Sequence, residues 1–436
     1  MKNSGVEWIG EIPENWEVKR GKELFFEIND RCKNPENYPL LSVSEYYGVA
    51  PKSEKIDEGD FITHAETLDG YKICQEGDIV QNIMLAWKRA TGMSNYEGLI
   101  SPAYCIYRPF KGVDSKYYHY LFRTDVYADL FKQFSTGIID SRLRLYPAKF
   151  LSLKYAYPPK STQQRIASYL DKKCNKIEET IQNQRQVIEK LKAYKQSLIT
   201  EAVTGKIKIQ NGKVCGKYES YKDSGVEYLG KIPSNWNIKR LRYIGKCQNG
   251  ISKGGEFFGS GYPFVSYGDV YNNLTLPETV SGLIESTPEE QENYSVMAGD
   301  IFFTRTSETI EEVGFTSVCL KTIEKATFAG FVIRVRPFTE ELVPDYSKYY
   351  FSSDAHRRFF VKEMNLVTRA SLSQDLLKRL PILIPSKDEQ KEIADYLDKK
   401  CTSIDAAIEQ KQKLIEKLTE YKKSLIYECV TGKKEI

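Results

Sequence analysis

An internal duplication constrains this chain more than any other feature. Residues 163–206 recur as residues 390–433, with about 25 of roughly 44 positions identical. A shorter pair of similar segments, residues 4–20 and 224–240, precedes each of two stretches that are not repeated in detail. The order of leader, variable block and conserved segment therefore occurs twice, which predicts two copies of one structural plan.

Both conserved segments are expected to form long helices. Apolar residues return every three or four positions, at the same phase in each copy, and this narrow seam needs a second helix to cover it. The predicted seam residues are Ile177, Ile181, Ile188, Leu191 and Leu198 in the first copy, and Ile404, Ile408, Ile415, Leu418 and Leu425 in the second. About 40 helical residues give a helix of roughly 60 Å.

The ends of the two helices carry similar signals. Capping boxes are predicted at the starts, formed by Ser161 with Gln164 and by Ser386 with Glu389. Each segment ends in Val-Thr-Gly-Lys, where the glycine can adopt the left-handed conformation that closes a helix.

The partner of each helix is left open by the pattern. Each could pack on an unrelated helix or globular surface, but the matching phase and length favour pairing with each other. If they run antiparallel, the chain acquires a pseudo-twofold axis. Four polar residues fall in the seam, where they could fix the register or reach out to solvent: Gln184, Lys195, Lys411 and Lys422.

The variable blocks, about 21–157 and 241–384, are rich in aromatic, β-branched and glycine residues and are expected to share a mixed α/β fold. Three landmarks recur in order, namely Gly-Asp-Ile at 77–79 and 299–301, Arg-Pro-Phe at 108–110 and 336–338, and Ser-Lys-Tyr-Tyr at 115–118 and 347–350. The predicted fold class is α+β, with two mixed α/β domains separated by a long antiparallel two-helix coiled coil. The expected limits are 1–158, 159–206, a linker 207–222, 223–384 and 385–436.

Basic and polar clusters occur where strands of the blocks should give way to loops. Arginine can hold a phosphate or read guanine, and serine or threonine can serve either purpose. The candidate DNA-binding residues are Lys88, Arg89, Ser135, Thr136, Arg142 and Arg144 in the first block, and Arg305, Thr306, Ser307, Thr368, Arg369 and Ser371 in the second. Taken singly, each cluster is more often a solvated loop. Because the clusters recur at matching places in both blocks, a function is supported as well as a solvated loop.

Two other aromatic features are interpreted as structural. The Ile-Pro-x-Asn-Trp leaders, at 12–16 and 232–236, are predicted to be docking turns whose tryptophans anchor each block. The 30 tyrosines could stack on bases, but at strand spacing most are expected in the core or on half-buried sheet surfaces.

The sequence offers little catalytic chemistry. Residues 257–261 fit the Phe-x-Gly-x-Gly loop of DNA methyltransferases, but the only Pro-Pro pair lacks the flanks of the accompanying base-binding loop, so a plain loop is expected. No P-loop occurs, and His64, His119 and His356 form no recognisable catalytic or metal-binding motif. Nine cysteines without Cys-x-x-Cys spacing indicate reduced structural thiols and no metal site. A non-catalytic binding protein is predicted.

Composition and charge limit where the protein is expected in the cell and what it is expected to bind. No apolar run approaches the roughly 18 residues that span a bilayer, and the N-terminus lacks a signal-peptide pattern, so a cytoplasmic protein is expected. The net charge is only +4, so any surface that binds nucleic acid must be local.

The ordered set of motifs resembles the specificity (S) subunits of type I restriction–modification systems over essentially the whole chain. The resemblance rests on the Ile-Pro-x-Asn-Trp leaders, the Ile-Ala-x-Tyr-Leu-Asp helix starts at 166–171 and 393–398, and the Val-Thr-Gly-Lys endings, each occurring twice in the same order. It implies two target recognition domains that each read one half of a split, asymmetric double-stranded DNA sequence.

The resemblance also implies partners and cofactors. Two modification subunits would use S-adenosylmethionine to methylate adenine N6, and two restriction subunits would use ATP, with Mg²⁺, to translocate and cut DNA. No cofactor is expected on this chain itself. Two near-identical helices independently suggest two copies of one partner. The alternatives are a fragment of a fused restriction–methylation enzyme with its own activity, and a coiled-coil scaffold that binds protein only.

Overall fold

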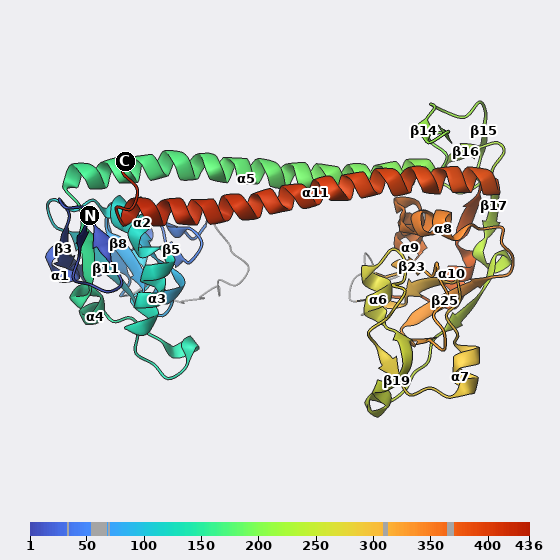
Figure 1. Cartoon of the computed structure of the whole chain (residues 1–436), viewed down its shortest axis with the longest axis horizontal. Helices are drawn as coiled ribbons and strands as arrows, with labels where there is room; N and C mark the ends of the chain where they lie inside the picture. Colours follow the sequence, from blue (N-terminus) through green and yellow to red (C-terminus); the bar gives the residue numbers. More distant parts are fainter. Residues whose placement is uncertain (33–34, 54–67, 69, 308–312, 364–369) are drawn as a thin grey trace. The chain divides into compact units, whose positions relative to one another are not determined.

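The computed structural model of the chain describes all residues except 33–34, 54–67, 69, 308–312 and 364–369. It divides into two compact units (Figure 1). Unit 1 comprises Met1–Gln184 and Gln412–Ile436, and unit 2 comprises Arg185–Lys411. Each unit therefore contains one leader, one variable block, the start of one long helix and the end of the other.

A four-stranded antiparallel sheet forms the centre of unit 1. Its strand order is β4 (Phe25–Ile28), β11 (Tyr104–Pro109), β8 (Ile79–Asn82) and β9 (Thr91–Met93). Smaller strand pairs are β5 (Leu41–Ser44) with β6 (Gly48–Pro51), β7 (Lys72–Cys74) with β10 (Gly98–Ile100), and β3 (Glu17–Arg20) with β12 (Lys154–Tyr157). The helices of the block are α2 (Ser115–Phe122), α3 (Asp125–Gln133) and α4 (Pro147–Ser152).

Unit 2 repeats the main sheet of unit 1 and its pairing of the strand at the end of the leader with the strand before the long helix. The equivalent sheet has the order β18 (Gly245–Asn249), β25 (Val332–Pro337), β21 (Ile301–Thr304) and β23 (Thr316–Val318). Strand β17 (Asn237–Arg240) pairs with β27 (Pro381–Ile384), and the helices are α8 (Pro344–Ser352), α9 (Asp354–Glu363) and α10 (Gln374–Arg379). Unit 2 adds β19 (Phe258–Val265), β20 (Leu283–Ile284), β24 (Thr327–Phe328), α6 (Tyr267–Asn272) and α7 (Pro288–Asn293). The predicted pair of mixed α/β domains is confirmed.

Two of the repeated sequence landmarks meet in one ion pair. The Arg108 guanidinium forms two 2.9 Å hydrogen bonds with the Asp78 carboxylate in unit 1. In unit 2, Arg336 binds Asp300 in the same way, at 2.7 and 2.6 Å. Both carboxylates are almost fully buried, so each arginine is needed to compensate the charge of its aspartate.

The third landmark, Ser-Lys-Tyr-Tyr, does not occupy equivalent structural positions in the two blocks. The Tyr117 hydroxyl donates to the Val430 carbonyl at 2.7 Å, and in unit 2 it is Tyr346, not Tyr349, that donates to the Val203 carbonyl at 3.3 Å. Matching the two Ser-Lys-Tyr-Tyr motifs therefore shifts the blocks by three residues. Three residues are nearly one helical turn, so the tyrosines of a shifted motif still point to one face and disguise the error.

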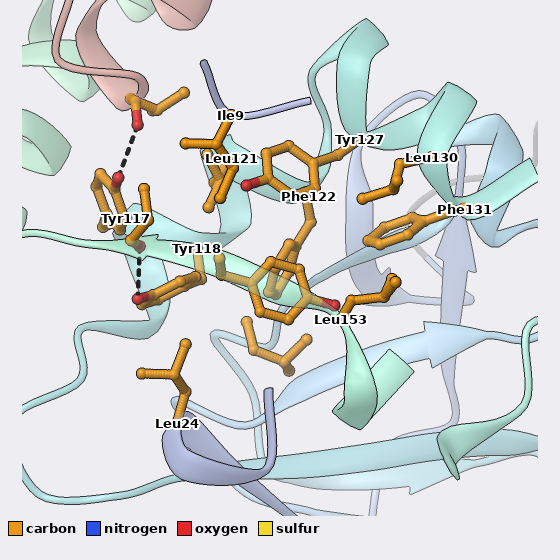
Figure 2. Close-up of a cluster of buried hydrophobic side chains, with 14 of the residues drawn as sticks. Ile9, Leu24, Tyr117, Tyr118, Leu121, Phe122, Tyr127, Leu130, Phe131 and Leu153 are labelled. Atoms are coloured by element: carbon orange, nitrogen blue, oxygen red, sulfur yellow. Dashed lines mark hydrogen bonds between the residues drawn. The ribbon is translucent and has the colours of Figure 1, made fainter. Parts of the chain in front are cut away.

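The core of unit 1 is largely aromatic (Figure 2). Phe122 packs against Phe25, Phe131, Phe150 and Tyr155 with ring centroids 5.1 to 6.0 Å apart. Buried tyrosine hydroxyls in this cluster find backbone acceptors, as burial requires. Five tyrosines of unit 1 are buried in this core, two of them on strands and three on helices: Tyr107, Tyr155, Tyr117, Tyr118 and Tyr127.

The two conserved segments form the helices α5 (Lys160–Val203) and α11 (Lys387–Val430). In unit 1 the start of α5 lies beside the end of α11, so the two run antiparallel (Figure 1). Seven predicted seam residues are buried and three are half-buried. The buried ones are Ile177, Ile181 and Leu425 in unit 1, and Ile188, Leu198, Ile404 and Ile408 in unit 2; the half-buried ones are Leu191, Ile415 and Leu418.

Two of the polar seam residues form ion pairs between the helices. Lys422 binds Glu178 at 2.9 Å in unit 1, and Lys195 binds Asp405 at 2.6 Å in unit 2. These are equivalent positions of the repeat, so each unit has the same cross-helix bond. The lysine side chains remain about 30 % exposed, and such pairs add little stability but favour one register.

Helix starts and ends differ in how well the sequence predicted them. The capping box at Ser161 is wrong because α5 begins one residue earlier and the Pro159 carbonyl accepts the first helical N–H groups. Ser386 does cap α11, with its Oγ 3.3 Å from the Glu389 nitrogen, but no reciprocal bond from the Glu389 side chain is present among its described contacts. The C-terminal glycines, Gly205 and Gly432, adopt φ of +71° and +73°, as predicted.

The leaders dock against these helix ends. Trp16 and Trp236 are buried, and an added Cβ at Gly432 would lie 2.4 Å from Pro13 Cδ. At Gly205 it would lie 2.3 Å from Pro233 Cδ. Only glycine fits both the backbone angle and this close approach, so the predicted docking turn is confirmed.

Two further observations complete the fold. Residues 257–261, predicted to be a plain loop, instead enter strand β19, where Gly259 and Gly261 take positive φ at an irregularity in the pairing with β20. Across the described ranges, no helix is both long and apolar enough to cross a membrane.

We predict that Gln163→Leu lowers the free energy of unfolding of the chain by about 3 kcal/mol, because it leaves buried backbone groups without partners. The fully buried Gln163 side chain accepts from the Asp114 N–H at 2.8 Å and donates to the Pro158 carbonyl at 2.8 Å. Chemical denaturation followed by circular dichroism measures the change.

The neighbouring Gln164 is exposed and provides the matched control. Gln164→Leu is expected to change stability by about 0.5 kcal/mol or less. Equal denaturant concentrations at the midpoint of unfolding for the two variants would contradict the anchoring role of Gln163.

Candidate nucleic-acid interface

In both units, the loop after the third strand of the main sheet lies beside the segment that precedes the last short helix. The Leu145 N–H donates to the Ile83 carbonyl at 2.9 Å, and the Leu372 N–H donates to the Arg305 carbonyl at 2.7 Å. These bonds join two chain segments that are more than 60 residues apart. They bring the predicted polar clusters of each block to one side of its sheet.

In unit 1 the first cluster sits in the short helix η2 (Ala86–Lys88) and the turn after it. Lys88 is exposed, with its ammonium 5.3 Å from the Trp87 ring centroid. Arg89 has φ of +68° and forms an ion pair with Asp125 at the start of α3. Lys88 is therefore the freer of the two for an anionic ligand, since Arg89 is partly neutralised.

The second cluster of unit 1 forms a closed loop that we call the tip loop, residues 136–144. Thr136 and Arg144 exchange both backbone hydrogen bonds, at 2.9 and 3.0 Å, which closes its neck. Arg142 is exposed, and the Arg144 guanidinium donates to the Arg142 carbonyl at 3.2 Å. The Ser135 hydroxyl instead donates to the Phe131 carbonyl at 2.6 Å, so it serves the end of α3.

Lys132 connects the two clusters of unit 1. Its ammonium lies 4.9 Å from the Trp87 ring centroid and 2.9 Å from the Asp140 carboxylate in the tip loop. Lys132 thus links the cluster around residue 88 to the tip loop.

In unit 2 the corresponding surface is formed by two very short strands. In β22 (Thr306–Ser307) and β26 (Ala370–Ser371), Thr306 pairs with Ser371. Arg305 precedes β22 and is half-buried. Thr368 and Arg369 lie outside the described residues, and only the backbone of Ser307 is described.

Sequence reasoning missed Arg123, which holds the unit 1 surface in place. Its guanidinium donates to the carbonyls of Arg89, Glu45 and Tyr46 at 2.7 to 3.0 Å. Burial, together with the charge of nearby Arg89, lowers the pKa of Arg123 to about 10, so it stays charged at neutral pH. No motif marks it, because its ligands are backbone atoms of distant turns.

Comparisons with known proteins agree with this architecture. A family model described as "Type I restriction modification DNA specificity domain" matches residues 233–420. The EcoKI specificity subunit of Escherichia coli K12 is 23 % identical, over 97 % of this chain and 90 % of that protein. The MjaVIII specificity subunit of Methanocaldococcus jannaschii is 25 % identical, over 97 % of this chain and 93 % of that protein.

Solved structures show the same fold. The HsdS subunit from Thermoanaerobacter tengcongensis aligns with a TM-score of 0.56 at 14 % identity, over 97 % of this chain and 98 % of that one. A chain from a structural study of complex assembly and conformational transition in a type I R-M system aligns with a TM-score of 0.72 at 13 % identity, over 97 % and 100 %.

The relatives match along nearly the full chain, and the family model covers most of the second repeat. Specificity subunits are the non-catalytic members of their systems, which agrees with the prediction made from the sequence. These comparisons support the resemblance of the chain to type I restriction–modification specificity subunits.

Proposed function

We propose that this chain reads a two-part double-stranded DNA target, with one half read by each unit. The observation that carries the proposal is a shared scaffold with unlike loops. The strand orders of the two main sheets are the same, and the Leu145 and Leu372 backbone bonds are equivalent. The side chains presented beside those bonds differ, with Arg144 in unit 1 and Ser371 in unit 2.

Different side chains on one scaffold should select different bases. Arginine binds phosphates or the O6 and N7 atoms of guanine, whereas serine and threonine make single hydrogen bonds with several bases. The two units would then recognise unlike half-sites, and the whole target would be asymmetric. The low net charge of +4 agrees with a chain that binds DNA tightly only as part of a larger complex.

The helices supply a surface for such a complex. Tyr194 and Tyr421 occupy equivalent positions of the repeat and are 55 % and 51 % exposed. Lys173 and Lys400 are likewise equivalent and exposed. Packing within the helices does not require identity at exposed positions, so a common partner accounts for it better. Each unit presents such a tyrosine and lysine on its pair of helix segments, which fits two copies of one subunit.

The partners would be two modification subunits, which methylate adenine N6 with S-adenosylmethionine, and two restriction subunits, which use ATP and Mg²⁺. Those cofactors would be bound by the partners and not by this chain. DNA modification and restriction would place the complex in the cytoplasm. The expected domain limits, 1–158 and 223–384 for the leaders with their recognition domains, belong to the same proposal.

Exchanging residues 21–157 for the corresponding block of another specificity subunit is predicted to change one half of the methylated target and leave the other half intact. The reason is that each main sheet and its loops are built within one block. Mapping of modified adenines in cells that express the chimaera, with its modification subunits, measures the outcome. A change in both halves, or in neither, would contradict the assignment of one half-site to each unit.

Arg142→Ala is predicted to weaken DNA binding by about tenfold at moderate salt and to reduce the slope of log Kd against log salt concentration by about 1, as expected when one phosphate contact is lost. Titration of target DNA with the purified complex at several salt concentrations measures both quantities.

Lys111→Ala removes one charge from an exposed turn of the same unit and serves as the control. It should leave the slope unchanged. Equal effects of the two substitutions would show that only the overall charge of the unit matters, against a DNA-contacting role for the tip loop.

A further inference from the structure

The most exposed large apolar side chain of unit 1 stands in the tip loop. Ile138 is 100 % exposed, and the next residue, Ile139, is 53 % exposed. Single exposed apolar residues are common on protein surfaces. Two consecutive exposed isoleucines on one loop of the candidate nucleic-acid interface are less common, and their exposure calls for an explanation.

The loop is built to hold these isoleucines away from the body of the unit. Its neck is closed by the two backbone bonds between Thr136 and Arg144, and Leu143 is buried on the inner side. An added Cβ at Gly137 would lie 2.6 Å from the Arg142 carbonyl oxygen, so the chain crosses itself closely there. Figure 1 shows the loop after α3 projecting from the rest of unit 1. Ile138 therefore lies on a fixed protrusion.

The charges around the protrusion favour a polyanionic partner. Arg142 and Arg144 flank the isoleucines on the C-terminal side. Asp140 is the acidic residue of the loop, and its ion pair with Lys132 offsets its charge. An apolar tip flanked by arginines suits a ligand whose phosphates surround an apolar interior, which is the arrangement of base pairs in duplex DNA.

We propose that Ile138 inserts between neighbouring base pairs of the half-site read by unit 1, and that Arg142 and Arg144 bind the adjacent phosphates. This rests on the proposed function and adds a mode of recognition to it. Aliphatic side chains are known to act as such wedges, and the cost of unstacking depends on the base step. Unit 1 would thereby select an easily unstacked step without hydrogen bonds to it.

Unit 2 offers an independent parallel on the same face of its own block. Phe331 is 64 % exposed, and its carbonyl accepts the Arg305 N–H at 2.9 Å. A large exposed apolar side chain next to a candidate DNA-binding arginine thus occurs in both units, although it comes from a different loop. The repetition supports a role for apolar side chains in reading DNA.

The test places 2-aminopurine, whose fluorescence rises when it is unstacked, at successive positions of the first half-site identified by methylation mapping. The full chain is used with its modification subunits. Because a methyltransferase flips its target adenine, that position is probed separately. With the natural chain, we expect fluorescence to rise several-fold at one base step outside the methylated position.

Ile138→Ala should abolish that rise under saturating protein, weaken binding about tenfold, and leave the signal at the methylated adenine intact. Ile138→Leu, which keeps an aliphatic side chain of equal size, should retain the rise. Specific binding with no unstacked step, or an Ile138→Ala variant with natural affinity and fluorescence, would overturn the wedge while leaving the proposed function in place. Failure of the natural complex to distinguish target from random DNA would overturn both.

Discussion

Each variable block depends on a small set of buried hydrogen bonds that attach it to two helix ends. In unit 1, Gln163 at the start of α5 bonds to the backbone before α2, and the Tyr117 hydroxyl satisfies the Val430 carbonyl at the end of α11. The last carbonyls of a helix have no partner within it, so a buried helix end requires such a donor. Gln390 and Tyr346 make the equivalent bonds in unit 2. The attachment is thus built from backbone groups and a few side chains that both units share, not from the loops.

This arrangement separates what the two blocks share from what distinguishes them. The ion pair between Arg108 and Asp78 joins β11 to the residue before β8 in unit 1, and its equivalent recurs in unit 2. The loops at the ends of the two sheets, in contrast, differ in length and in side chains. Unit 2 can therefore accommodate the additional strands β19 and β20 and the helix α7 while its sheet order is preserved. A scaffold of this kind can change its loops without losing its attachment to the helices.

The sequence predicted the repeated plan because duplication and helical periodicity are visible in residue types alone. It failed where geometry decided the outcome. The motif that contains Tyr117 was aligned three residues out, because tyrosines one turn apart look alike in sequence. Ser161 is not the cap predicted from the sequence, because the Pro159 carbonyl, two residues earlier, accepts the first helical N–H groups. The sequence did not predict a role for Arg123, because its partners are backbone carbonyls. It did not predict one for Ile138 either, because the full exposure of that side chain on a closed loop is visible only in the structure.

The central claim is that the loops at one end of each main sheet face the DNA, while the helix ends attach the blocks. A structure of the full chain, with its modification subunits, on DNA that carries the mapped target tests this most directly. The account predicts that Arg142 and Arg144 of unit 1, and Thr306 and Ser371 of unit 2, lie within hydrogen-bond distance of phosphates or base edges. A complex in which the DNA contacts the opposite ends of the sheets, with these four residues in solvent, would contradict it.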